Sequence, residues 1–184
     1  MRILISILVI FSLLGSNWLI GTDNELYGTP DEDYEFVGRI WDETPDEIKQ
    51  TWPSEYLAYG VGLSSQEFDL MARVVQAESN GTYDWSDFED KVLIAAVIFN
   101  RKDSGQFYNT INGVLNEPGQ FSTTSGGYCS CSSSESSRWA IVEAQRRLQN
   151  GDIPRNLLYF NCIGYNYGTP YGCFGGNYFM TAGG

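Results

Sequence analysis

The run Val92–Phe99 constrains the fold more than any other part of this 184-residue chain, because every one of its side chains is apolar. The preceding Ser86-Asp87-Phe88-Glu89 is typical of a helix start, so the pattern predicts a helix here. A helix that is apolar on every face is expected to lie buried in the centre of a domain. Other helices or strands must therefore cover it on all sides.

Amphipathic segments that could supply this cover flank the run on both sides. Further helices are predicted over 64–78, 108–115 and 136–149. The first begins at a Ser64-x-x-Glu67 capping box, and the first and last are each followed by an Asn-Gly pair that stops a helix. Irregular and hairpin structure is expected towards the C-terminus. The predicted fold is therefore mainly α, in the α+β class.

The N-terminal residues 1–21 have the layout of a targeting segment. Arg2 precedes an apolar run, and small residues follow it, as in a secretory signal peptide. No small-x-small cleavage triplet follows the run, so an uncleaved membrane anchor over residues 3–20 is the alternative. With either reading, the body of the protein is exported to the periplasm or cell envelope or to the extracellular space.

Charge divides the rest of the chain into an arm and a domain. Residues 22–60 hold 11 acidic and 2 basic side chains, which gives −9 of the total −12. Such a segment, with scattered aromatic residues and no clean period, is expected to be an acidic linker or loosely packed arm. Residues 61–184 hold 12 acidic and 8 basic side chains and are expected to form one compact domain. A negative balance disfavours a nucleic-acid ligand.

The chain has no histidine, which excludes several hydrolytic mechanisms. Ser-His-Asp hydrolases, Cys-His peptidases and zinc amidases with imidazole ligands all need this residue. General acid and base chemistry must therefore fall to carboxylates, tyrosine, lysine or cysteine.

Glu78 is the strongest candidate for such chemistry. It follows Met71 and Val75 at helical spacing, which places a carboxyl group on the apolar face of the last helical turn. Partial burial and the negative end of the helix dipole both favour a protonated carboxyl there. Cleavage of a glycosidic bond requires an acid of this kind. The alternative is a boundary residue that turns to solvent or pairs with an arginine such as Arg73.

A series of sequence strings resembles the SleB-type cell wall hydrolases, which include the spore cortex-lytic enzymes. The strings run in the family's order over about residues 66–180: Leu70–Glu78, Val92–Arg101, Asn109–Leu115, Pro118–Ser122, Leu158–Asn161 and Gly175–Phe179. The resemblance implies a lysozyme-like fold and cleavage of peptidoglycan between N-acetylmuramic acid and N-acetylglucosamine. It also implies a lytic transglycosylase activity without a metal or cofactor.

The resemblance assigns roles to particular positions. Glu78 ends the family's Ala-Glu string and is the implied catalytic residue. Gln120, Phe121 and Tyr159 are implied to contact substrate. Asn177 is also assigned to substrate binding, although the family often has histidine there; asparagine can form hydrogen bonds but cannot titrate.

A lytic transglycosylase needs only one carboxyl group, because the attacking 6-hydroxyl belongs to the substrate itself. A hydrolytic muramidase would require a second one. The candidates near Glu78 in the sequence are better explained as cap, first-turn or surface charges: Asp69, Asp84, Asp87 and Glu89. The transglycosylase is therefore favoured over the hydrolase.

The cysteines Cys129, Cys131, Cys162 and Cys173 are even in number, as in exported proteins with disulfides. A direct bond between the first two would be strained, so each is expected to pair with Cys162 or Cys173. A four-thiolate zinc site is the competing interpretation, but the spacing lacks a Cys-x-x-Cys knuckle.

Two other functions remain open at this point. Residues 159–184 contain five Tyr and three Phe and no charged residue, a composition that suits stacking on sugar rings or covering a core. A non-catalytic glycan-binding or envelope structural domain is thus one alternative, and an amidase acting on the peptide stem is the other. In each case we expect a monomer whose partner is peptidoglycan, with membrane contact only through the N-terminal segment.

Overall fold

The computed structural model describes residues 11–13, 16–20, 26–27, 41, 44–79, 84–121, 123–124 and 129–183. The chain forms two compact units, Met1–Pro45 and Asp46–Gly184. The described part of the first unit contains three short antiparallel strands in the order β1-β2-β3: β1 (Phe11–Leu13), β2 (Ser16–Ile20) and β3 (Leu26–Tyr27).

Most of the predicted signal peptide or anchor, and much of the acidic arm, lie outside the described residues. Among the residues that are described, no helix is both long and apolar enough to cross a bilayer.

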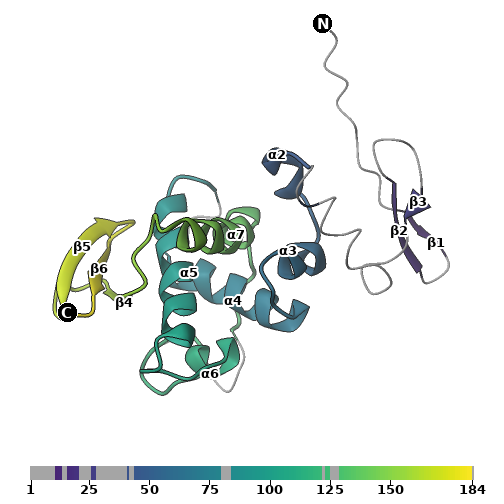
Figure 1. Ribbon diagram of the computed structural model, residues 1–184. Coiled ribbons are helices and arrows are strands. Elements are labelled where there is room, and N and C mark those ends of the chain that lie inside the picture. The colour runs from purple at the N-terminus through teal and green to yellow at the C-terminus, as the bar shows by residue number, and fades with distance from the viewer. Residues whose placement is uncertain are drawn as a thin grey trace, which may run out of the picture. The chain divides into compact units, whose positions relative to one another are not determined.

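The second unit contains six helices and three strands in its described residues (Figure 1). The helices are α2 (Asp46–Lys49), α3 (Ser54–Gly60), α4 (Ser65–Glu78), α5 (Phe88–Asp103), α6 (Ile111–Leu115) and α7 (Glu135–Asn150). The strands are β4 (Leu157–Asn161), β5 (Thr169–Phe174) and β6 (Asn177–Thr181). The mainly α fold with a C-terminal hairpin is confirmed.

Helix α5 is the central element of this unit. Every residue from Asp90 to Arg101 is buried, as the apolar run predicts. Helices α4, α6 and α7 and strand β4 all pack against it. Figure 1 shows the sheet on one side of α5 and helices α4, α6 and α7 around the rest of it. Burial of side chains such as Leu93 and Ile98 on every face stabilises this arrangement.

Local signals set the ends of the helices. Ser64 and Glu67 form the predicted capping box of α4. Helix α7 ends at Gly151, whose left-handed φ of 81° suits glycine. Helix α6 is shorter than predicted, because the Thr110 side chain caps it by accepting a hydrogen bond from the amide of Gly113.

The compact unit begins at Asp46, ahead of the domain start expected at 61. Helix α3 packs against α4 and α7 and buries Tyr56, Leu57 and Ala58. The acidic composition of the expected arm over 22–60 conceals this short apolar face, because most of its charge precedes α3.

The sheet has the antiparallel strand order β4-β6-β5. Tyr178 of β6 faces Asn161 of β4 on one side and Cys173 of β5 on the other. Gly175 and Gly176, both with positive φ, make the tight turn from β5 into β6. This turn brings the first residue of β6, Asn177, to the helical part of the unit, where it bonds to Glu78 and Asp90.

Candidate active site

Glu78 is the last residue of α4 and its side chain is half-buried. The hydroxyl of Thr123 donates a hydrogen bond of 2.7 Å to Oε1 of Glu78. The neighbouring Thr124 hydroxyl donates to the carbonyl of Leu115 at 2.6 Å and to that of Phe121 at 3.1 Å. The loop after α6 is therefore tied to its own helix, and it holds the Glu78 carboxyl in one orientation.

Asn177 connects three elements next to Glu78. Its Nδ2 donates to the backbone carbonyl of Glu78 at 3.1 Å. The same nitrogen donates to Oδ1 and Oδ2 of Asp90 at 3.1 Å and 3.2 Å. Asn177 is 6% exposed and Asp90 only 1%. The end of α4, the first turn of α5 and the start of β6 thus meet at one side-chain amide.

Asp90 is a buried carboxyl group in an unusual electrostatic setting. Burial raises its pKa to about 7, and the nearby Asp87 acts in the same direction. The hydrogen bond from Asn177 and the charge of Lys91 oppose this increase. Asp90 therefore changes its charge near neutral pH.

Arg101, near the C-terminal end of α5, is a buried cation. Its guanidinium lies over the rings of Phe107 and Phe121, at 4.8 Å and 5.3 Å from their centroids. Its Nε donates to the carbonyl of Leu158 at 2.8 Å. Burial lowers the pKa of Arg101 to about 10, against the effect of nearby Glu117, Tyr159 and Glu78. Arg101 is therefore still charged at neutral pH, within electrostatic range of Glu78.

The structure places the other predicted site residues in different environments. Tyr159 is half-buried, with its ring beside those of Phe107 and Tyr167, and Gln120 is exposed. Phe121 is buried at 4% exposure and packs against Phe160. Asn177 is buried too, and its amide nitrogen points at Glu78 and Asp90. Phe121 and Asn177 thus support the site from within the core.

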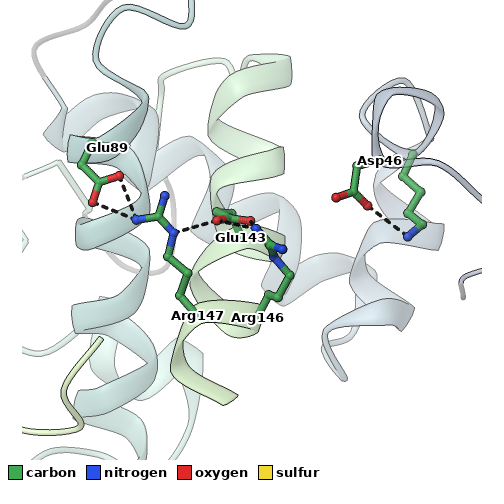
Figure 2. Close-up of polar contacts among 6 residues, drawn as sticks. Asp46, Glu89, Glu143, Arg146 and Arg147 are labelled. Atoms are coloured by element: carbon green, nitrogen blue, oxygen red, sulfur yellow. Dashed lines mark hydrogen bonds and ion pairs between the residues drawn. The ribbon is translucent and has the colours of Figure 1, made fainter. Parts of the chain in front are cut away.

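The acidic residues considered as a second catalytic carboxyl have structural partners. Asp69 forms an ion pair with Arg73, and Asp84 accepts hydrogen bonds from Ser86. Figure 2 shows Glu89 bound through both carboxylate oxygens to Nη1 of Arg147, at 2.9 Å each. The same guanidinium contacts Glu143 through its Nε at 2.6 Å.

Sequence reasoning missed Asp90, Thr123 and Arg101. Asp90 could have been found, since it lies in the first turn of a helix that is apolar on every face and must therefore be buried. Arg101 could have been predicted to be buried too, because it lies near the other end of the same helix. Thr123 gave no such signal, because only the folded loop brings it to Glu78.

The predicted disulfides are not present: all four cysteines are free thiols. Cys129 is buried, and its carbonyl accepts a hydrogen bond from Arg73 of α4 at 3.3 Å. Cys162 and Cys173 are exposed, after β4 and within β5. The prediction failed because spacing in the sequence does not show which elements carry each thiol. Burial raises the pKa of the Cys129 thiol, which disfavours its reactive thiolate.

The class of protein follows from comparison of this architecture with solved structures. The catalytic domain of the germination-specific lytic transglycosylase SleB from Bacillus anthracis matches with a TM-score of 0.53 and 28% identity. The match covers 65% of this chain and 98% of that domain. The catalytic domain of Bacillus cereus SleB matches with a TM-score of 0.50 and 29% identity, covering 64% and 91%. The chain therefore has the lysozyme-like α+β fold of these catalytic domains.

Sequence comparisons agree with this structural match. Residues 85–167 match the family model described as Cell Wall Hydrolase. The spore cortex-lytic enzyme of Bacillus cereus is 33% identical over 99 residues, which cover 54% of this chain and 36% of that protein. That of Bacillus subtilis is 35% identical over 102 residues, covering 54% and 31%. The matched region is thus about a third of these relatives' length. The resemblance is confirmed: residues 85–167 are similar to the cell wall hydrolases, and the fold is similar to that of the SleB catalytic domains.

Proposed function

We propose that this protein is an exported peptidoglycan-degrading enzyme. It cleaves the glycan backbone between N-acetylmuramic acid and N-acetylglucosamine as a lytic transglycosylase, with Glu78 as the catalytic residue. The observation that carries the proposal is the half-buried Glu78 carboxyl at the end of α4, oriented by Thr123, in a fold shared with a lytic transglycosylase.

These residues suit a mechanism in which one carboxyl group acts in two steps. Glu78 first donates its proton to the glycosidic oxygen, which leaves with the N-acetylglucosamine side of the strand. The resulting carboxylate then accepts the proton of the muramyl 6-hydroxyl, whose oxygen bonds to C1 and closes a 1,6-anhydro ring. Thr123 binds Oε1, so Oε2 is assigned as the oxygen that carries the proton. Arg101 supplies a positive charge within electrostatic range of this carboxylate.

Export is part of the proposal. Two of the similar proteins are named spore cortex-lytic enzymes, and a wall polymer lies outside the cytoplasm. The apolar segment in residues 1–21 would direct the chain there as a signal peptide, or hold it at the membrane as an anchor. Fractionation of cells with an antibody against the domain, compared with a chain lacking residues 1–21, tests this step.

The activity is tested by digesting purified peptidoglycan and identifying the products by mass spectrometry. Anhydro-muropeptides are expected from the native protein and not from Glu78→Gln. Glu135→Gln, which changes an exposed glutamate in the first turn of α7, is the matched control and should keep full activity. Activity that persists in folded Glu78→Gln would refute the role of Glu78. New reducing ends would indicate a muramidase, and new amino termini an amidase.

A glycan-binding module is the second candidate, because tyrosine side chains are exposed on one charge-free region. Tyr165, Tyr167 and Tyr171 are 43%, 61% and 40% exposed. Flat aromatic faces of this kind stack against sugar rings. Sedimentation with insoluble peptidoglycan in the absence of any released product would favour this function over the enzyme.

A further inference from the structure

The backbone carbonyl of Glu78 lies at a position where a helix leaves its acceptors without partners. The last carbonyls of a helix have no amide in the next turn to bind. Ser79 already has extended backbone, with φ −72° and ψ 157°, and its amide donates back to the carbonyl of Val75. The carbonyl of Glu78 instead accepts a bond from Asn177, which lies 99 residues further along the chain.

Asn177 is itself oriented by Asp90. A side-chain amide carries two protons and can serve two acceptors at once. Nδ2 of Asn177 lies 3.1 Å from the Glu78 carbonyl oxygen and 3.1 Å and 3.2 Å from the two carboxyl oxygens of Asp90. The Asp90 carboxyl therefore fixes the orientation of the Asn177 amide. The Asn177 amide in turn fixes the position of the last peptide group of α4.

The turn before β6 is shaped to allow this contact. Gly175 has φ +55°, and a Cβ built on it would lie 2.6 Å from Oδ2 and 2.7 Å from Cβ of Asp90. No other residue type fits there without moving Asp90. The β5–β6 turn thus rests directly on the carboxyl group that orients Asn177.

From this geometry we propose that Asp90 and Asn177 are positioning residues for glycan cleavage: Asp90 orients the Asn177 amide, and the amide holds the peptide group of Glu78 so that its carboxyl is aimed at the glycosidic oxygen. The inference rests on the proposed role of Glu78 as general acid. Neither residue touches the reacting atoms. A small error in the direction of an acid is costly, because catalysis depends on alignment to within a fraction of an ångström.

The burial of Asp90 argues against a role in stability alone. A buried carboxylate is destabilising unless it is fully paired. Among the described residues, the groups that face Asp90 are Asp87 and Lys91 on its own helix, Asn177 on β6 and Gly175 in the turn before it. An uncharged residue would serve the fold better, which leaves the orientation of the Asn177 amide as the reason for a carboxyl here.

The test compares Asn177→Ala and the isosteric Asp90→Asn with the native protein on soluble glycan strands. Asn177→Ala is expected to lower kcat about 10- to 100-fold, with KM changed less than about threefold. Asp90→Asn is expected to lower kcat at pH 8 about threefold or more, because the charge that orients the amide is lost. At pH 5 it should match the native protein, whose Asp90 is then uncharged.

Asn156→Ala is the matched control. It removes an exposed asparagine that likewise donates to a backbone carbonyl, that of Ala182 at 3.1 Å, and should leave kcat unchanged. The inference is overturned if folded Asn177→Ala keeps its kcat, or if the loss lies in KM. If Asn177→Ala does not fold, an Asp90→Asn effect that is equal at pH 5 and pH 8 overturns it. These outcomes are distinct from failure of the proposed function, which shows as an active Glu78→Gln.

Discussion

Helix α5 and strand β5 belong to the same compact unit and differ in almost every physical respect. Residues 90–101 of α5 are buried throughout, yet they include two charged side chains of the candidate site, Asp90 near the start of the helix and Arg101 near its end. Strand β5 is largely exposed and belongs to a C-terminal region without any charge. In the proposed function this difference would be a division of labour, in which the rigid core orients Glu78 and the exposed tyrosine side chains of the C-terminal region contact the glycan.

The largest expected effect follows from truncating the buried helix. Ile98→Ala, at a fully buried position of α5, should lower the free energy of unfolding by about 2–5 kcal/mol. Ile163→Ala, at a position 82% exposed between β4 and β5, should change it by less than about 0.5 kcal/mol. Urea denaturation of both variants measures the contrast. Equal losses would contradict the central place given to α5.

Asp90 should make the stability of the domain depend on pH. Its pKa is raised from the usual 3.8 to about 7 on folding, so the folded state binds the proton more tightly. The stabilisation is complete below pH 4 and is lost as pH rises through 7, by up to about 4 kcal/mol. Asp90→Asn should abolish this decrease, as measured by urea denaturation at pH 4 and pH 8. The exposed Asp152→Asn should retain it.

The β5–β6 turn, which packs against Asp90, should not tolerate an added methyl group. Gly175→Ala is expected to cost about 3 kcal/mol, because it adds a steric conflict with Asp90 to the strain of a positive φ. Gly62→Ala has a similar φ of +70° but open space around it, so it should cost only about 1 kcal/mol. Thermal unfolding separates the two, and equal losses would show that the turn does not press on Asp90.

The smallest expected effect concerns the exposed tyrosine side chains of the C-terminal region. Tyr171→Ala on β5 should weaken binding to peptidoglycan by about 1 kcal/mol, roughly fivefold, with little loss of stability. Tyr108→Ala, at a residue 56% exposed and outside the sheet, is the control. Sedimentation with insoluble peptidoglycan measures both. Equal binding by the two variants would contradict the proposed role of β5 in glycan binding.

Periodicity and capping predicted helices α4 to α7 well, because both are local properties. The buried run of α5, the capping box of α4 and the stop of α7 at Gly151 were all legible in the sequence. The contacts of Glu78 with Thr123 and Asn177 were not, since they join residues 45 and 99 positions apart. The prediction of disulfide pairs failed for the same reason. The sequence shows how many thiols there are, whereas their positions relative to one another depend on the fold.

In the proposed mechanism, Glu78 directs an attack by the substrate's own 6-hydroxyl, and water takes no part. Digestion of peptidoglycan in H₂¹⁸O with mass spectrometry of the muropeptides tests it most directly. The account predicts new chain ends that are anhydro-muramyl groups and contain no ¹⁸O, all of them absent with Glu78→Gln. Chain ends that carry ¹⁸O, or anhydro products that survive in folded Glu78→Gln, would contradict it.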